Sequence, residues 1–569
     1  MSERPSTAPA IVVLGAAALA TARRIQALYP GARVHGLSGR VEGADVAYHE
    51  FGDSLRELYR QNTPIIALCA AGIVIRTLAP LLAEKGAEPP VLAVAEDGSA
   101  VVPLLGGLGG VNGMARAIGG ALAVAPAITT SGELRFGACL LAPPSGYALA
   151  DLEQGKRFVS DLLGGESVRV EGDAPWLDAV DLPRDIGAPR AIRIDHGRGI
   201  PAADELRIYP RNTLVAVAEL SVDIESVVRA ALDQAGVAEQ ALACLLAPSR
   251  RMADAALHDA AQQLHVPLRF TDAASASAMA RQCLPSASLH EVTDGLCVAV
   301  ADAPLSVDTL GHRRGRLSVI GLGPGDRAFM LPVVKRALAQ ATDVLGYETY
   351  VRMAGPFRDD QMLHCTDNRE EMQRARHAFE LAAQGGSVVV VSSGDPGVFA
   401  MAAAVLEALH ESERADWHAV ELEILPGVSA SLATAAQAGA PLGHDFCAIS
   451  LSDNLKPWQV IEQRLDLAAQ ADLAMAFYNP ISRARPWQLG QALDIVRRHR
   501  APATPVTLGR DIGRPGQTLR VLTLGELTPE MVDMRTMVLI GSSTTCAFPR
   551  ADGGMWVYTP RWYGDKPRT

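Results

Sequence analysis

Cysteine is scarce in this sequence and is nowhere clustered. The 569 residues include eight cysteines, and none of them forms a C-x-x-C pair. This absence argues against a disulfide framework and against a structural zinc site. We therefore expect buried free thiols and no metal site formed by the protein itself.

Long hydrophobic runs and net positive charge are also missing. No apolar run approaches the roughly 20 residues that a membrane-spanning helix needs. The apolar residues 11–20 precede Arg23 and Arg24 instead of following them, which favours a first strand and helix over a secretion signal. The formal net charge of −11 argues against nucleic acid as a partner. We expect a cytoplasmic protein that binds neither membranes nor nucleic acid.

The most informative feature present is a set of glycine-rich turns that follow apolar runs. Residues 317–320 lead into Gly-Leu-Gly-Pro-Gly-Asp at 321–326, which departs from the dinucleotide pattern G-x-G-x-x-G. Comparable turns follow the apolar runs at 387–391, 420–425 and 473–477, and helix-like stretches such as 372–384 and 401–410 separate them. Alternating strand, turn and helix predict a parallel α/β sheet, with ligands beyond the carboxyl ends of its strands.

These motifs resemble the tetrapyrrole methylases of cobalamin biosynthesis, and within them the branch that methylates precorrin-3B at C-17. The matching segments are 321–326, 392–399, 425–430, 443–446, 449–453, 478–480, 485–489 and 541–544. The resemblance covers about residues 316–563. It implies a fold of two α/β subdomains with the active site between them, S-adenosylmethionine as cofactor, a tetrapyrrole substrate and a homodimer formed through this domain.

The resemblance also implies which loops hold the cofactor. The expected contacts are Gly323, Pro324, Gly394, Asp395, Val398, Ser429, Ala430, Tyr478, Asn479, Leu508 and Gly509. Taken alone, residues 394–397 are equally consistent with a simple turn. We expect Gly394 to be required because only glycine allows a close backbone approach there. Methyl transfer from a sulfonium to carbon is an in-line displacement, which depends chiefly on positioning and charge complementarity.

Ring contraction, which the resemblance implies, additionally requires proton transfers. The candidate catalytic residues are Asp326, His444 and Asp453, with Asp445 beside them. Asp326 is also suited to capping the next turn, and His444 is equally consistent with an ordinary loop histidine. Substrate carboxylates favour guanidinium partners. The candidates for that role are Arg369, Arg483 and Arg485, followed by Arg374 and Arg510.

The N-terminal part has its own pattern of elements. Residues 65–69 read as a strand, 70–80 as a turn and short helix, and 91–105 as a hairpin. Over about residues 9–140 this pattern resembles the N-terminal domain of cobalt-precorrin-5A hydrolase. The loop at 106–112 lacks the serine and histidine of that family, so we expect no lactone hydrolysis. An active hydrolase using Glu133 or Asp97, and a non-catalytic tetrapyrrole-binding module, remain the alternatives.

The expected fold class is α/β throughout, divided into five segments. Residues 1–140 form the hydrolase-like domain, and 141–212, rich in Pro, Gly and Asp, form a connecting region or a small excursion domain. Residues 213–302 form a small α/β domain that weakly resembles the C-terminal domain of the hydrolase. A basic linker at 303–315 precedes the methylase domain at 316–569. The resemblance implies methylation of precorrin-3B at C-17 with contraction to precorrin-4, or alternatively methylation of a cobalt-containing or differently substituted precorrin.

Overall fold

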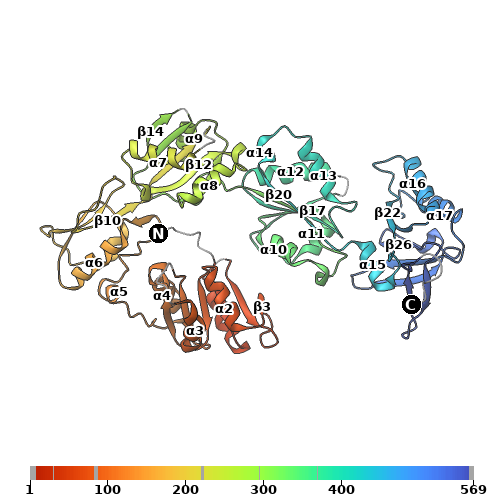
Figure 1. Ribbon diagram of the computed structural model, residues 1–569, viewed down its shortest axis with the longest axis horizontal. Helices are drawn as coiled ribbons and strands as arrows, with labels where there is room; N and C mark the ends of the chain where they lie inside the picture. Colours follow the sequence, from red (N-terminus) through yellow and green to blue (C-terminus); the bar gives the residue numbers. More distant parts are fainter. Residues whose placement is uncertain are drawn as a thin grey trace. The chain divides into compact units, whose positions relative to one another are not determined.

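The computed structural model describes residues 8–29, 31–82, 88–219, 223–293, 295–367 and 370–562 (Figure 1). The chain divides into two compact units. Unit 1 comprises residues 1–248 and 254–311, and unit 2 comprises residues 249–253 and 312–569. Strands and helices alternate in both units, which confirms the predicted α/β class.

The first sheet of unit 1 has the strand order β3-β2-β1-β4-β5-β6, and β6 alone among these strands runs antiparallel to its neighbour. Its strands are β1 (Ala10–Val13), β2 (Arg33–Leu37), β3 (Val46–Tyr48), β4 (Ile65–Leu68), β5 (Val91–Val94) and β6 (Val101–Leu105), and its helices are α1 (Leu19–Gln26), α2 (Phe51–Arg60), α3 (Ala71–Leu78) and α4 (Val111–Leu122). Helices α1 and α4 pack on one face, and α2 and α3 pack on the other. The predicted strand at 65–69, short helix and hairpin are confirmed as β4, α3 and β5–β6.

A second sheet lies in the segment expected to be a connecting region. Its order is β7-β10-β9-β8, formed by β7 (Tyr147–Leu149), β8 (Val168–Glu171), β9 (Arg190–Ile194) and β10 (Glu205–Pro210), with helices α5 (Ser131–Phe136) and α6 (Leu152–Leu163). One face carries a core that includes Phe136, Phe158 and Ile192. Residues 141–212 therefore fold together with α5 around a shared core, and the four-stranded sheet itself was not predicted from the sequence.

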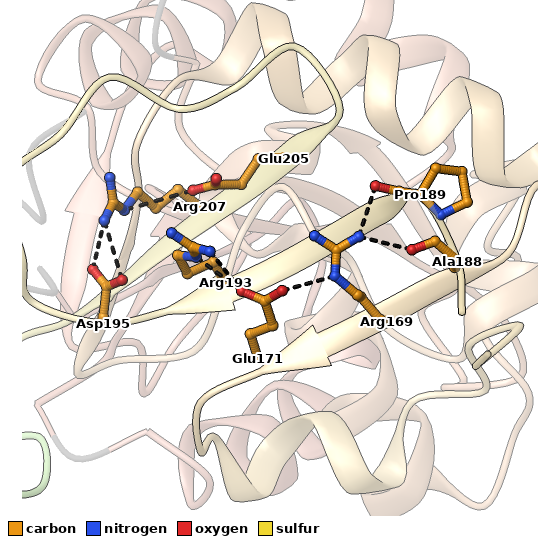
Figure 2. Close-up of polar contacts among 8 residues, drawn as sticks. All are labelled: Arg169, Glu171, Ala188, Pro189, Arg193, Asp195, Glu205 and Arg207. Carbon is orange, nitrogen blue, oxygen red and sulfur yellow. Dashed lines mark hydrogen bonds and ion pairs between the residues drawn. The ribbon is translucent and has the colours of Figure 1, made fainter. Parts of the chain in front are cut away.

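The opposite face of this sheet is charged, as Figure 2 shows. Glu171 on β8 stands opposite Arg193 on β9, which stands opposite Arg207 on β10. Glu171 accepts hydrogen bonds from Arg169 Nε at 2.7 Å and from Arg193 Nη2 at 2.7 Å. Arg207 is largely buried and pairs with Asp195 at 2.9 Å. The Glu171–Arg193 pair across neighbouring strands stabilises the sheet, and the carboxylates of Glu171 and Asp195 balance the facing arginines Arg193 and Arg207.

The third sheet of unit 1 has the order β13-β12-β11-β15-β14. It comprises β11 (Thr213–Val217), β12 (Leu242–Pro248), β13 (Leu268–Thr271), β14 (Ser288–Thr293) and β15 (Leu296–Val300), with α7 (Ile224–Gln234), α8 (Ala255–Gln263) and α9 (Ala276–Cys283). The sequence runs 213–219, 241–246 and 268–270 predict strands, and 224–235 and 252–264 predict helices; these agree within a few residues with β11, β12, β13, α7 and α8. Helix α9 and the antiparallel pair β14–β15 are additional.

Unit 2 begins with an entirely parallel sheet of order β18-β17-β19-β16-β20. It consists of β16 (Arg316–Gly321), β17 (Asp343–Tyr347), β18 (Met362–Thr366), β19 (Ser387–Ser392) and β20 (Glu421–Leu425), with α10 (Pro332–Gln340), α11 (Glu348–Ala354), α12 (Glu371–Ala383), α13 (Met401–His410) and α14 (Ala415–His418). Helices α10 and α11 cover one face, and α12 and α13 cover the other (Figure 1). The parallel sheet predicted from runs 317–320, 387–391 and 420–425 is confirmed.

The fourth run, 473–477, lies in a different sheet, so its assignment to the parallel sheet was wrong. That sheet is mixed, with the order β22-β23-β26-β24-β25. It comprises β22 (Phe446–Ser450), β23 (Ala474–Tyr478), β24 (Pro505–Arg510), β25 (Thr518–Thr523) and β26 (Thr536–Ile540). A strand buried on both faces is apolar in either sheet, so its composition does not reveal which partners it has.

Helix α15 (Ala430–Ala438) packs on one face of the mixed sheet, whereas α16 (Trp458–Gln470) and α17 (Gln488–Arg497) pack on the other. A small sheet of order β21-β28-β27 completes the unit, from β21 (Gly439–Ala440), β27 (Cys546–Pro549) and β28 (Met555–Tyr558). All eight cysteines are free as predicted, but Cys365 and Cys546 are exposed instead of buried. In the described ranges of the chain, no helix has both the length and the apolar character needed to cross a bilayer.

Candidate active site

The carboxyl ends of β16, β19 and β20 meet in a backbone junction made of glycines. Gly323 and Gly394 exchange two backbone hydrogen bonds, of 3.1 and 2.8 Å, and both have positive φ, +75° and +69°. A Cβ added to Gly321 or to Gly427 would overlap the carbonyl oxygen of Gly394. A Cβ on Gly394 would meet nothing closer than 3.6 Å. The backbone does come close at Gly394, but the residues that must be glycine to allow it are Gly321 and Gly427, which lie against the Gly394 carbonyl. Gly394 itself is required because its φ is positive.

Asp395 joins the loops that follow β19 and β20. Its Oδ1 accepts the N–H of Gly397 at 2.8 Å, and its Oδ2 accepts the N–H of Gly427 at 3.0 Å. The backbone N–H of Val398 bonds the carbonyl of Asp395 at 3.2 Å. Both carboxylate oxygens thus hold the two loops together, which fixes the shape of the junction.

Helix α15 starts beside this junction and carries the chain to the mixed sheet. Ser429 caps it, because Ser429 Oγ accepts the N–H of Leu432 at 3.4 Å. Ala430 is the first helical residue, and N–H groups at a helix start lack partners within the helix. Tyr478, at the end of β23, meets the same turn through a 2.8 Å hydrogen bond between its Oη and Ser431 Oγ.

Three strands of the mixed sheet end at the edge where Tyr478 lies. Strand β22 is parallel to β23, and both β23 and β24 are antiparallel to β26, so all three point the same way. The loops after them carry Asp453, Asn479 and Asp511. Asp453 accepts the side-chain amide of Gln488 at 3.2 Å, and Asn479 Nδ2 donates to Ser450 Oγ at 3.1 Å.

Two of the predicted catalytic residues have other surroundings. Asp326 caps the 3-10 helix at 327–329, because its Oδ1 accepts the N–H of Ala328 at 2.8 Å. His444 precedes β22, whereas Asp453 follows it, and the strand between them spans roughly 17 Å at 3.3–3.4 Å per residue. The structure therefore places His444 and Asp445 at the opposite end of β22 from Asp453 and Tyr478.

The arginines expected to bind substrate differ in how they are engaged. Arg485 is 8% exposed and donates to the carbonyl of Asn479 at 3.2 Å, and in the described parts of the chain it has no carboxylate partner. Arg483 is exposed on the same loop, and Arg369 lies outside the described residues. Arg374 is buried with its Nε donating to Thr366 Oγ1 at 2.7 Å, and Arg510 pairs with Asp533 at 2.8 Å. Of the four described arginines, Arg374 and Arg510 thus have structural partners.

Sequence reasoning missed Arg514, which reaches from the loop after β24 to the first sheet. Its Nε donates to the carbonyl of Pro324 at 3.0 Å, and its Nη2 lies 3.4 Å from Ser393 Oγ. Gly513 packs on the ring of Pro324, since a Cβ there would lie 2.8 Å from Pro324 Cγ. The only sequence signal is the turn Gly-Arg-Pro-Gly at 513–516, which reveals nothing about its partner.

Phe399 and Lys456 were also missed. The ring of Phe399 lies 5.1 Å from that of Tyr478, and Lys456 Nζ lies 5.8 Å from the Phe399 ring centroid. Phe399, Asn479 and Asp511 have positive φ, and they are three of the eight non-glycine residues in the described segments that do. Such backbone outliers concentrate at functional sites. Both sheets therefore contribute strained residues to the same place.

Comparisons with known proteins match this region and part of unit 1. Residues 316–528 match the family described as Tetrapyrrole (Corrin/Porphyrin) Methylases, and residues 53–133 match the one described as Cobalamin synthesis G N-terminal. A precorrin-3B C(17)-methyltransferase of Sinorhizobium sp is 52% identical over 249 residues, which are 44% of this chain and 97% of that protein.

Two further matches concern the same half of the chain. The cobalamin biosynthesis protein CobIJ of Mycobacterium bovis is 44% identical over 301 residues, which are 52% of this chain and only 57% of that protein. A crystal structure of the methyltransferase CobJ is 52% identical, with a TM-score of 0.41, and the match covers 43% of this chain and 100% of that one.

Proposed function

Because the chain belongs to the tetrapyrrole methylase family, we propose that it methylates precorrin-3B at C-17, using S-adenosylmethionine, and contracts the ring to precorrin-4 in cobalamin biosynthesis. The chain is an S-adenosylmethionine-dependent methyltransferase by family. The observation that carries the proposal is the glycine junction of β16, β19 and β20 beside the start of α15, within the segment that matches the methylases.

The residues at the junction fit this cofactor. Its carboxylate suits the start of α15, where unpaired backbone N–H groups and the helix dipole favour negative charge. Two threonine hydroxyls on facing elements, Thr434 on α15 and Thr507 on β24, are buried, and in the described part of the chain neither has a hydrogen-bond partner. Gly509 on β24 faces Thr434, since a Cβ on it would be 2.7 Å from Thr434 Oγ1. Both hydroxyls are closed off from solvent, so they belong to the packing of α15 on β24 and not to a ligand surface.

We assign the predicted cofactor residues accordingly. Gly323, Pro324, Gly394, Asp395 and Val398 form the first wall, and Ser429, Ala430, Tyr478, Asn479 and Gly509 form the second. Leu508 contributes its backbone only, because its side chain is buried in the core under α16 and α17.

S-adenosylmethionine, when bound, supplies a methyl group activated by its sulfonium. The chain holds the acceptor carbon in line with that methyl, and fixed loops provide this positioning better than mobile ones. Asp453 is the proton-transfer candidate that the structure leaves at this edge, with Gln488 donating to it at 3.2 Å. Arg485, with Arg483 on the same loop, is the candidate for a substrate carboxylate.

The test is methyl transfer by the full chain. Purified precorrin-3B and isotopically labelled S-adenosylmethionine are expected to give a product labelled at C-17 with a contracted ring, identified by mass spectrometry and NMR. Label at another macrocycle carbon would contradict the proposal. Turnover only of the cobalt-containing substrate would select the alternative in which cobalt is inserted first.

For unit 1 we propose a tetrapyrrole-binding role without lactone hydrolysis. The two residues considered as substitutes for the missing histidine are already engaged. Glu133 is buried and accepts Asn112 Nδ2 at 2.7 Å and Arg116 Nη2 at 2.6 Å. Hydrogen bonds from the Ser99 hydroxyl and then its backbone N–H lower the pKa of Asp97, which makes it a weaker base.

A ring-A-lactone precorrin given to the full chain is therefore expected to release no acetaldehyde over many equivalents of substrate. Sustained release would make the chain bifunctional. A homodimer formed through the methylase domain and a cytoplasmic location are further parts of the proposal, tested by analytical ultracentrifugation and by cell fractionation.

A further inference from the structure

Phe399 occupies an unusual position for a large apolar side chain. It ends the loop that carries Gly394, Asp395 and Val398, it is 50% exposed, and its φ is +52°. A bulky residue in the left-handed region is a conformational outlier. The local backbone therefore holds an aromatic ring out from the cofactor loop.

The contacts of Phe399 come from the other sheet. Tyr478, at the end of β23, meets its ring at a centroid distance of 5.1 Å and an interplanar angle of 57°. Tyr478 is itself fixed through its hydrogen bond to Ser431 on α15. The two rings thus make a firm aromatic surface where the strand ends of both sheets meet, adjacent to the proposed cofactor loops.

Lys456, from the loop between β22 and α16, places a positive charge over the Phe399 ring. Its Nζ lies 5.8 Å from the Phe399 ring centroid, within the range of a cation–π contact. In the described segments it forms no ion pair, and the charge that influences it most is another cation, Arg464. Partial burial first, and Arg464 second, lower the pKa of Lys456.

We propose that Phe399 and Lys456 bind the tetrapyrrole substrate: the Phe399 ring packs on the face of the macrocycle, and the Lys456 ammonium pairs with one of its carboxylates. The inference rests on the proposed function, which it deepens by naming substrate-binding residues. A macrocycle with apolar faces and carboxylates at its rim matches an exposed aromatic ring beside a cation that forms no ion pair in the described segments.

The experiment measures two affinities of the full chain separately. Uroporphyrin III, a stable octacarboxylate macrocycle, is titrated by fluorescence, and S-adenosylmethionine is titrated by calorimetry. Phe399→Ala is expected to weaken uroporphyrin binding about tenfold through loss of aromatic packing. Lys456→Met is expected to weaken it about fivefold and to reduce its dependence on salt. Phe399→Trp should retain it, and none of these changes should alter the affinity for S-adenosylmethionine.

Matched controls exist in the same unit. Phe548 is 47% exposed and its ring contacts Tyr558 at 6.0 Å, which repeats the Phe399–Tyr478 pair away from the strand ends. Lys335 is an exposed lysine on α10. Phe548→Ala and Lys335→Met are expected to leave both affinities unchanged. All these variants have the same unit 1, so any uroporphyrin that binds to unit 1 contributes equally to each titration and does not affect the comparison.

Unchanged uroporphyrin affinity in both Phe399→Ala and Lys456→Met would overturn the inference. Loss of S-adenosylmethionine affinity in Phe399→Ala, with uroporphyrin binding intact, would also overturn it, because the ring would then belong to the cofactor site. A wild-type chain that binds no S-adenosylmethionine would instead contradict the proposed function, and the uroporphyrin comparison would still report on Phe399 and Lys456. If Phe399→Ala lowers the melting temperature too far for its affinity to be measured, Lys456→Met still tests the inference.

Discussion

Gly427 has the least room of the residues at the strand-end junction. A Cβ there would overlap the carbonyl oxygen of Gly394 and lie 2.8 Å from the carbonyl carbon of Gly321, and both obstacles are backbone atoms. At Gly394 the nearest atom would be 3.6 Å away, so only the φ of +69° opposes a side chain. The two glycines are required for different reasons, and their alanine variants should differ.

We predict that Gly427→Ala destabilises unit 2 by at least about 3 kcal/mol, because overpacking against backbone cannot be relieved by rotamer changes. Gly394→Ala should cost only about 1–2 kcal/mol, the penalty of a left-handed residue. Gly490→Ala, inside α17, is the control and should stabilise by up to about 1 kcal/mol. Calorimetric melting of the full chain ranks the three. Equal losses in Gly427→Ala and Gly394→Ala would contradict the steric account.

For single residues, the sequence showed where the glycines of the junction lie but not why each position requires glycine. Gly321, Gly394 and Gly427 all fall within motifs that were recognised, yet only the structure shows which of them touches which carbonyl. Which side chains lie near one another was even harder to predict. His444 and Asp453 are close in the sequence, but β22 separates them, and Arg514 meets Pro324 from far along the chain. Such contacts depend on strand direction and sheet edge, which local patterns do not encode.

At the scale of elements, the sheet β7-β10-β9-β8 shows that strands with one charged face are difficult to recognise in the sequence. The segments Val-Arg-Val-Glu of β8 and Arg-Ala-Ile-Arg-Ile of β9 alternate charged or small residues with apolar ones. That two-residue period is typical of half-buried strands. Frequent Pro, Gly and Asp around these short segments led to the expectation of a connecting region, although the signal for two strands was present.

We predict that the charged face weakens in acid through Glu171. Hydrogen bonds from Arg169 first, and Arg193 second, lower the pKa of Glu171 below its ordinary value of 4.5. A carboxyl with a lowered pKa in the folded state stabilises above its unfolded pKa, and this contribution is lost as pH falls through the folded pKa. Glu171→Gln should therefore have a lower melting temperature than the wild type at pH 7. This difference in melting temperature should disappear as the pH falls below about 4.5.

Thermal melting of both chains between pH 7 and pH 3.5 checks this expectation. Glu413→Gln is a suitable control, because Glu413 is exposed and forms no ion pair within the described ranges. A gap for Glu171→Gln that stays constant with pH would mean that the side chain contributes through packing instead of charge.

At the scale of the whole molecule, the division falls between Gly311 and His312. Much of the expected linker is bonded into unit 1, since Leu305 N–H donates to the carbonyl of Arg211 at 2.9 Å and Arg269 Nε donates to that of Leu310 at 2.9 Å. The methylase start expected at residue 316 coincides with the first residue of β16. The boundaries of the other expected segments stay predictions.

We predict that a fragment of residues 312–569 folds and binds S-adenosylmethionine with an affinity within about threefold of the full chain, because it contains both sheets of unit 2 and their cores. It lacks residues 249–253, including Ser249, whose Oγ lies 2.9 Å from His312 Nε2, so a slightly lower melting temperature is expected. Calorimetric titration provides the measurement, with fragment 1–311 as the control that should not bind. A folded 312–569 without affinity would refute the placement of the cofactor site.

The position of β16 in its sheet also has a consequence during synthesis of the protein. It is the first strand of its sheet to leave the ribosome, yet it lies between β19 and β20, which are made later. Its neighbour β19 begins roughly 70 residues downstream, which at roughly 5–20 residues per second leaves β16 without a partner for several seconds. During that interval a strand that is buried almost throughout in the finished protein is exposed to other chains. An unpaired apolar strand of this kind is prone to aggregation until the rest of its sheet has been made.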